Sequence, residues 1–292
     1  EIDSLKKDIG EMRSTLESEQ RIRALIKKQL TEIGKKYGQP RQTEIIHEDD
    51  VVVISKEELI EDYNLKVLMT KGGYFKKIPL TALRTSPEQK VKDDDFILQE
   101  AEWHNKSEIL FVSDRCNVYK MRLYEMPECK ASGLGEYLPN ILDMEQEEKI
   151  IYFVVTDNYA GMMLYAFENG KIAKVPLEAY MTKTNRKKLI KSYSDKSPIV
   201  AALYTASDTD LGLLSGNDRI LVVDSEKITL KTTKNTQGIQ IMKLKKNVTL
   251  KSMVKAQDLN VANFALYRAR TIPSSGSTYK EEDKPIQQLS LL

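Results

Sequence analysis

The stretch KVLMTKGGYFKKIPL at residues 66–80 joins an apolar strand to a second strand through a tight glycine turn. The same unit recurs later in the chain, always with a polar or glycine turn and a basic residue in the second strand. The other copies are EILFVSDRCNVYKMRLYEMP at 108–127, GMMLYAFENGKIAKVPL at 161–177 and DLGLLSGNDRILVVDSEKI at 210–228. Their turns lie near Gly73, Cys116, Gly170 and Asn217, a period of roughly 45–50 residues, which is typical of blade-like β repeats.

Basic residues follow shortly after every one of these turns. They are Lys76, Lys77, Lys120, Arg122, Lys171, Lys174 and Arg219. Equivalent positions of a repeat array come to equivalent places on its surface, so the pattern predicts a rim lined by cations. The alternative is that these residues protect exposed edge strands against aggregation.

Charge is unevenly distributed along the 292 residues, although the formal net charge is only +2. Residues 91–150 contain 7 basic and 14 acidic residues, whereas residues 171–255 contain 17 basic and 7 acidic residues. This asymmetry indicates a polyanionic partner for the second half of the array. The chain contains no run of about 18 apolar residues, and its first residues do not resemble a signal peptide, so we expect a cytoplasmic protein without a membrane partner.

Catalytic and metal-binding motifs are missing from the sequence. It has no Gly-x-Ser-x-Gly elbow, no phosphate-binding Gly-x-x-x-x-Gly-Lys-Ser/Thr loop and no paired-carboxylate motif. The two histidines and two cysteines lack the spacing of zinc ligands, and the acidic run at 93–95 is typical of a solvated loop more than of a metal site. The sequence therefore indicates a binding module without a metal or a catalytic site.

The repeats are preceded by a predicted helix over residues 1–37. Its apolar residues from Ile2 to Leu16 follow a heptad pattern, and the stripe then moves to another face of the helix. Gly38 and Pro40 predict the end of this helix. We expect an arm helix at 1–38, a connector at 39–60, the strand and turn array at 61–272 and a flexible tail at 273–292.

The order of motifs resembles the A subunit of bacterial type IIA DNA topoisomerases, that is, DNA gyrase or topoisomerase IV. In that family a stretch similar to LTEIGKKYGQPRQTEI at 30–45 joins the coiled-coil arm to the C-terminal domain. The first hairpin, at 73–80, is similar to the family's Gly-Tyr-x-Lys-Arg-x-Pro-Leu strand. Further similar stretches lie at 95–97, 118–127, 135–142 and 235–239.

The resemblance implies a mainly β fold, a β-pinwheel of four or five blades preceded by one long helix. It also implies a domain that binds duplex DNA on a basic rim, bends it and does not read its sequence. The family's catalytic tyrosine precedes the coiled coil and has no counterpart here, so this part needs no cofactor. The parent enzyme would be an ATP-dependent isomerase using Mg²⁺, located at the nucleoid, in which the partner B subunit completes an A2B2 heterotetramer.

The resemblance also singles out the cations that would bind DNA. They are Lys76, Lys77, Lys171, Lys174, Lys183, Arg186, Lys187, Lys188, Lys191, Arg219, Lys231, Lys234, Lys243, Lys245 and Lys246. Gyrases carry a Gln-Arg-Arg-Gly-Gly-Lys-Gly box after the first hairpin, whereas this chain has RTSPEQKVKDDD at 84–95, which favours a topoisomerase IV-like domain. The competing hypothesis is a propeller that binds a protein partner and not DNA, and the acidic residues at 91–150 favour it.

Overall fold

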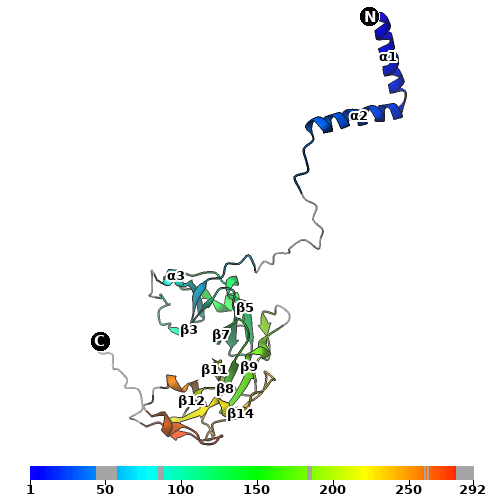
Figure 1. Cartoon of the computed structure of the whole chain (residues 1–292). Helices are drawn as coiled ribbons and strands as arrows, with labels where there is room; N and C mark the ends of the chain where they lie inside the picture. Colours follow the sequence, from blue (N-terminus) through cyan, green and yellow to red (C-terminus); the bar gives the residue numbers. More distant parts are fainter. Residues whose placement is uncertain (44–57, 85–88, 183–185, 260, 262, 281–292) are drawn as a thin grey trace. The chain divides into compact units, whose positions relative to one another are not determined.

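The structure is a computed structural model, which describes residues 1–43, 58–84, 89–182, 186–259, 261 and 263–280. The chain forms two compact units, Glu1–Ile54 and Ser55–Leu292. The first unit contains two helices, and the second contains four small β-sheets (Figure 1). No helix in the described ranges is both long enough and apolar enough to cross a membrane.

The helical unit consists of α1 (Ile2–Leu16) and α2 (Glu19–Tyr37), where the sequence predicts one continuous helix. Ser18 separates them because its backbone is extended and its side chain accepts a hydrogen bond from the Arg21 amide at 3.4 Å. Serine is a favoured N-cap, so it starts a new helix at this point. The break coincides with the change of face in the apolar stripe.

The β unit contains four antiparallel sheets, which we number as blades 1 to 4 in chain order. Blade 1 has the strand order β3 (Ile97–His104), β1 (Asn64–Thr70), β2 (Tyr74–Pro79) and β6 (Glu136–Tyr137). Blade 2 has the order β7 (Ile150–Thr156), β4 (Glu108–Ser113), β5 (Val118–Arg122) and β10 (Lys188–Leu189).

The last two blades repeat this arrangement. Blade 3 has the order β11 (Ile199–Thr205), β8 (Met162–Phe167), β9 (Lys171–Pro176) and β14 (Ile239–Gln240). Blade 4 has the order β15 (Leu250–Lys255), β12 (Asp210–Ser215), β13 (Arg219–Asp224) and β16 (Ser277–Thr278).

The hairpin in the middle of each blade is one of the four repeats seen in the sequence, so that prediction is confirmed. Each turn contains a residue with a left-handed backbone. These residues are Gly73 (φ +86°), Cys116 (φ +60°), Gly170 (φ +79°) and Asp218 (φ +55°). In blade 4 the left-handed residue is therefore Asp218 and not the neighbouring Asn217.

The fourth strand of blades 1 to 3 comes from the chain that follows the next hairpin. For example, β6 lies after the β4–β5 hairpin of blade 2 but pairs with β2 of blade 1. In blade 4 the fourth strand is β16, which lies within the stretch expected to be a flexible tail. Arg219 holds this stretch, since its Nε donates to the Ser275 carbonyl at 2.8 Å. The exchange of strands links every blade to the next, as in a β-pinwheel.

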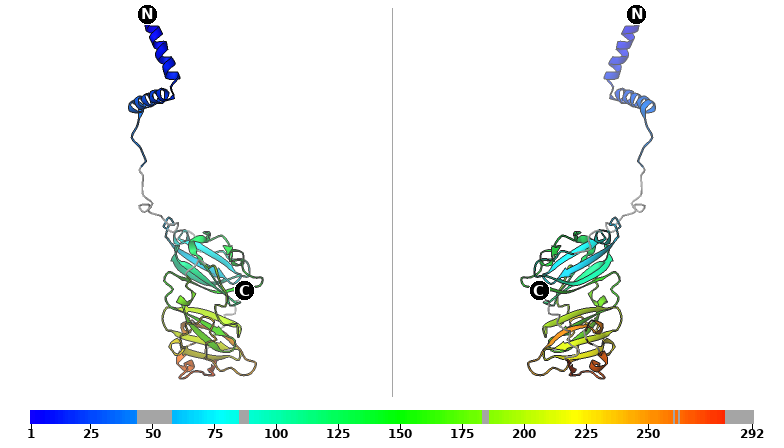
Figure 2. Two further views of the ribbon diagram at one scale, coloured as in Figure 1. Left: turned by 90° about the vertical axis from the view of Figure 1, so that its right-hand side faces the viewer. Right: turned by 90° about the vertical axis from the view of Figure 1, so that its left-hand side faces the viewer.

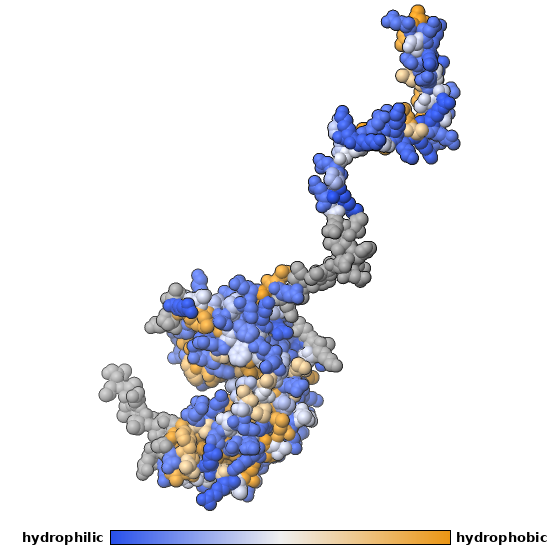
Figure 3. All heavy atoms as spheres, in the orientation of Figure 1, coloured by the Kyte–Doolittle hydropathy of each residue, from blue (hydrophilic) through white to orange (hydrophobic). Residues whose placement is uncertain are grey.

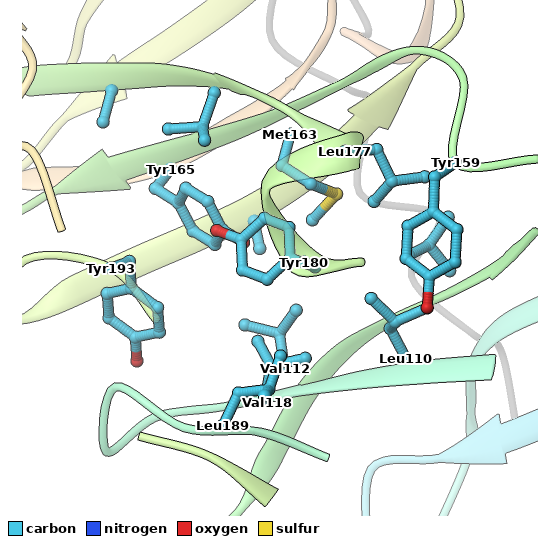
Figure 4. Packing of buried hydrophobic residues seen from close by; sticks show 14 of the residues in the cluster. Leu110, Val112, Val118, Tyr159, Met163, Tyr165, Leu177, Tyr180, Leu189 and Tyr193 are labelled. Atoms are coloured by element: carbon cyan, nitrogen blue, oxygen red, sulfur yellow. The ribbon is translucent and has the colours of Figure 1, made fainter. Parts of the chain in front are cut away.

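Three apolar clusters fill the spaces between successive blades. The cluster between blades 2 and 3 brings Leu110 and Val112 of β4 against Met163 and Tyr165 of β8 (Figure 4). Equivalent clusters join blade 1 to blade 2 and blade 3 to blade 4. The sheets follow one another along the β unit in the order of the sequence (Figure 2).

The two ends of the array are covered by short helices. The first blade packs against α3 (Leu80–Leu83), and the last packs against η5 (Ala256–Asp258) and η6 (Phe264–Tyr267). None of the apolar clusters found among the described residues joins blade 1 to blade 4. The four blades follow one another in an open arc (Figure 1).

The strands β3, β7, β11 and β15 form the inner edge of this arc, because each contacts its counterpart in the next blade. The Gln99 side chain of β3 donates to the Phe153 carbonyl of β7 at 2.7 Å and accepts from its amide at 3.0 Å. The Tyr204 amide of β11 donates to the Tyr152 hydroxyl of β7 at 3.1 Å. At the opposite, outer edge lie the exchanged strands β6, β10, β14 and β16.

Glycine precedes the exchanged strand in three blades, at Gly135, Gly238 and Gly276. All three have a left-handed backbone, and a Cβ on Gly238 would lie 2.1 Å from the carbonyl oxygen of Ile172. We expect Gly238→Ala to lower the free energy of unfolding by about 1–3 kcal/mol, because both the backbone angle and this contact become unfavourable. Urea denaturation measures the loss.

The matched control for Gly238→Ala is Gly216→Ala. Gly216 is exposed, and the nearest atom to its added Cβ is the flexible Cε of Lys251 at 3.1 Å. The control should change the free energy of unfolding by less than about 0.5 kcal/mol. Equal losses in the two variants would contradict the role given to Gly238.

Candidate nucleic-acid interface

Three of the lysines that follow the hairpin turns are buried and occupy the same position in their blades. Lys77, Lys120 and Lys174 face Val67, Leu110 and Leu164, respectively, in the neighbouring hairpin strand. Their exposed fractions are only 3%, 5% and 4%. This common position indicates a common role within the fold.

The amino groups of these lysines reach into the following blade. Lys77 donates to the carbonyls of Leu123 and Met126 at 3.0 and 3.1 Å, at the turn η2 (Leu123–Glu125). Lys120 donates in the same way to the Tyr180 carbonyl at 3.2 Å, at the end of η3 (Leu177–Tyr180). Each lysine therefore ties its own blade to a short helical turn of the following blade.

Lys174 completes the series. It donates to the Ser225 carbonyl at 3.0 Å, at the start of η4 (Ser225–Lys227), and forms an ion pair with Asp208. The hydrogen bonds from Lys174 and Ser225 hold the pKa of the Asp208 carboxyl below its usual value. Blade 4 has no following blade, and there the equivalent position holds Val222, which faces Gly212.

Lys76 is also buried, with 1% of its surface exposed, and it donates to the carbonyls of Lys90 and Ala131 at 2.9 and 2.8 Å. Burial lowers the pKa of both Lys76 and Lys77. A phosphate cannot reach these amino groups without opening the fold. Their burial argues against a place for Lys76, Lys77 and Lys174 on a DNA-binding surface, and equally against a role in protecting an exposed edge strand.

Two other post-turn cations are only partly exposed. The Nζ of Lys171 lies 3.3 Å from Oε1 of Gln237, within the same blade. Arg219 is engaged by the carbonyls of Ser275 and Gly276, so its guanidinium fixes the C-terminal strand. Neither residue projects freely from the outer edge of the array.

The exposed cations gather instead on the segments that carry the exchanged strands, which we call the outer connectors. The connectors of blades 2, 3 and 4 span residues 181–194, 229–246 and 268–280, and their sequences contain basic but no acidic residues. The connector of blade 1, residues 128–144, contains Lys130 together with Glu128, Glu136 and Asp143. We call the cations of the connectors of blades 2 to 4 the basic rim.

In the connector of blade 2, Arg186, Lys187 and Lys191 are exposed. Lys188 is more constrained, because its Nζ lies 2.9 Å from Oε1 of Glu145, which raises the pKa of this lysine. Lys187 lies 3.7 Å from Glu125 but keeps 75% of its side chain exposed. Lys183 belongs to the residues outside the described ranges.

The connector of blade 3 carries Lys231, Lys243, Lys245 and Lys246, all exposed, together with Lys234. Lys234 is half-buried, and its Nζ lies 5.9 Å from the centre of the Tyr180 ring. Within the described part of the chain, none of these five lysines forms an ion pair. Their charges are therefore available to an external anion.

The connector of blade 4 adds three exposed cations, Arg268, Arg270 and Lys280, that our sequence prediction missed. Arg268 forms an ion pair with Asp210, whereas Arg270 projects without one among the described residues. They lie around the boundary where the flexible tail was expected to begin. The sequence signal that could have identified them is the composition of residues 268–280, which include basic but no acidic residues.

The surface of the β unit is mostly hydrophilic, with smaller apolar patches on the face shown in Figure 3. Among the described residues, no three His, Cys, Asp or Glu side chains are grouped so as to hold a metal ion. What distinguishes the outer edge is thus its positive charge. Exposed lysines and arginines on adjacent segments can neutralise a regularly spaced series of phosphates.

Curated proteins provide sequence relatives of this chain. It is 27% identical over 233 residues to the DNA gyrase A protein of Campylobacter jejuni subsp. jejuni, covering 76% of this chain and 26% of the relative. It is 28% identical over 291 residues to the DNA gyrase A protein of Mycobacterium leprae, covering 92% of this chain and 22% of the relative. The chain thus spans about a quarter of the length of these relatives. No protein-family model matches the sequence.

Solved structures share the fold. The C-terminal domain of DNA topoisomerase IV superposes with a TM-score of 0.61 at 23% identity, covering 69% of this chain and 64% of that one. The DNA gyrase A C-terminal domain gives a TM-score of 0.52 at 16% identity, covering 75% of this chain and 80% of that one. The predicted resemblance is confirmed, and so is the β-pinwheel predicted with four or five blades, of which the structure has four.

Proposed function

We propose that this chain is the DNA-binding and DNA-bending part of the A subunit of a type IIA topoisomerase, and that the basic rim is its DNA surface. The observation that carries the proposal is the position of the rim. Three consecutive connectors without acidic residues lie at the same edge of adjacent blades. Duplex DNA bent along this edge would meet cations at each of the three blades in turn.

The chemistry of the rim accounts for binding without base recognition. Lysine side chains contact phosphates as mobile point charges, and release of the condensed counterions supplies most of the free energy of such binding. Smooth bending of a site of 20–30 base pairs costs roughly 1–6 kcal/mol. Several phosphate contacts along the arc are therefore needed to offset the cost of the bend.

The length of the arc supports a topoisomerase IV-like role. Gyrases typically have six blades in this domain, so the four blades of this chain give DNA a shorter path. Residues 84–95 also lack the glycine pair and the paired arginines of the gyrase box. We propose that the domain steers the topology preference of the enzyme. Strand cleavage would belong to the rest of the A subunit, while ATP hydrolysis would belong to the B subunit, in an A2B2 assembly at the nucleoid.

Fluorescence anisotropy with two duplexes of unrelated sequence tests the proposal. The chain should bind both duplexes with similar affinity at low salt, and the affinity should fall steeply as salt is added. Absence of binding at low salt, or an affinity that does not change with salt concentration, would contradict the proposed function. That result would favour the competing function, a propeller that binds a protein partner through the acidic residues at 91–150.

Plasmid topology provides a further prediction. When the chain is mixed with relaxed plasmid and a nicking-closing enzyme, we expect little or no change in linking number, because the short arc without the gyrase box bends DNA but does not close a wrap. Gel electrophoresis of the topoisomers measures the change. A large negative shift in linking number would exclude the topoisomerase IV-like assignment.

A further inference from the structure

Directly after its exchanged strand, the outer connector of blade 2 has one residue more than the connectors of the other three blades have at the same point. In blade 1 a single residue, Tyr137, separates Glu136, which faces Phe75, from Leu138, whose amide donates to the Gly73 carbonyl at 2.9 Å. Blades 3 and 4 have the same spacing, with Gln240 and Thr278 as the single residue.

In blade 2 two residues, Ile190 and Lys191, occupy this place. They lie between Leu189, which faces Val118, and Ser192, whose amide donates to the Cys116 carbonyl at 2.8 Å. Lys191 takes a left-handed backbone with φ +52°, which is unfavourable for a residue other than glycine. The additional residue therefore forms a bulge, and bulges re-aim the side chains beside them.

The bulge presents an isoleucine to solvent. Ile190 is 65% exposed, compared with 41% for the equivalent Tyr137. Arg186 and Lys187 precede it and Lys191 follows it, all three exposed, and the connector contains no acidic residue. An exposed aliphatic side chain at the tip of a strained turn, with cations on both sides, suits a polyanion that also offers an apolar contact. The stacked base pairs of DNA provide that combination.

We propose that Ile190 inserts between two base pairs from the minor groove of a duplex held on the basic rim, and so kinks the DNA at blade 2. The proposal rests on the function proposed above. The flanking cations bind the phosphates on either side, while the isoleucine partly unstacks one base step, as apolar wedges do in proteins that bend DNA. Part of the curvature that DNA needs to follow the arc would then be concentrated in one kink, at blade 2.

Energy transfer between dyes at the two ends of a duplex of about 40 base pairs tests the wedge. Ile190→Ser should lower the transfer, which reports a smaller bend, and weaken binding about 5–10-fold, because unstacking is no longer offset by the inserted side chain. The dependence of affinity on salt should not change, since no charge is lost. Ile190→Leu should retain the bend, and Leu134→Ser, at an exposed leucine in the connector of blade 1, should leave both quantities unchanged.

A second duplex, with a two-base mismatch at its centre, identifies the mechanism. Its bases are already unstacked there, so Ile190→Ser should bind it within about twofold of the unsubstituted chain. The wedge is overturned if Ile190→Ser bends the intact duplex normally, or if its loss of affinity is equally large on the mismatched duplex. Both outcomes leave the proposed function standing, whereas a failure of the unsubstituted chain to bind either duplex would remove the proposed function itself.

Discussion

Replacing Arg186, Lys187, Lys191, Lys245 and Lys246 together by glutamine is expected to weaken duplex binding by roughly 10²–10⁴-fold at low salt. All five residues are exposed on the basic rim, in the connectors of blades 2 and 3. Each phosphate contact contributes about 0.9 to the slope of log affinity against log salt, so the slope should become shallower by about 4–5. Fluorescence anisotropy across a salt series gives both quantities.

The control must lose the same charge elsewhere. Substituting glutamine for Lys71, Lys90, Lys92, Lys106 and Lys130, in the region of blade 1, likewise changes the formal net charge from +2 to −3. This variant should keep most of the affinity and of the salt slope. If the two variants lose affinity equally, net charge and not the rim is responsible, and our assignment of the surface is wrong.

Lys174→Met is expected to lower the free energy of unfolding by about 2–4 kcal/mol. Methionine fills a similar volume but cannot donate, so the Ser225 carbonyl and the Asp208 carboxylate lose the partner that joins blade 3 to blade 4. Both acceptors keep another partner, the Ile228 amide for the carbonyl and the Ser225 hydroxyl for the carboxylate, so the loss is that of the two hydrogen bonds from the charged amino group. A hydrogen bond to a charged group contributes roughly 1.5–3 kcal/mol. The midpoint of urea denaturation reports the loss.

Lys171→Met is the matched control, three residues earlier on the same strand. Lys171 is partly exposed, and the hydrogen-bond partner of its amino group among the described residues is a glutamine side chain, so the substitution should cost less than about 0.5 kcal/mol. DNA binding gives a second test of Lys174→Met, under conditions where this variant remains folded. Its DNA affinity should depend on salt as steeply as that of the unsubstituted chain. A shallower slope in this variant would mean that Lys174 does contact phosphate.

The repeating architecture could be predicted from the sequence because each hairpin is encoded locally. An apolar strand, a turn residue able to adopt a positive φ and a second apolar strand recur together, as at Gly73 and Gly170. The exchanged strands have only two residues each, too short for a hydrophobic period to mark them or to show which blade they join. In the sequence, the feature that marks two of them is the glycine directly before β6 and before β14.

The role of the lysines could not be predicted in the same way. A lysine in an apolar strand has the same letter whether its amino group lies in solvent or against the carbonyls of another blade. Lys77 donates to Leu123, 46 residues away, and only the assembled array brings these groups together. The charge composition of the segments was a better guide to the exposed cations than the position of a lysine after a turn. The excess of basic residues at 171–255 comes largely from the connectors of blades 2 and 3, which the structure places at the outer edge.

The most direct measurement is lysine footprinting by acetylation and mass spectrometry, with and without saturating duplex DNA. If the basic rim is the DNA surface, Lys187, Lys191, Lys243, Lys245 and Lys246 will lose reactivity when DNA is bound. Lys71 and Lys130, exposed on blade 1, will react equally in both states. Rim lysines that react as fast with DNA as without it, or protection confined to blade 1, would contradict the account.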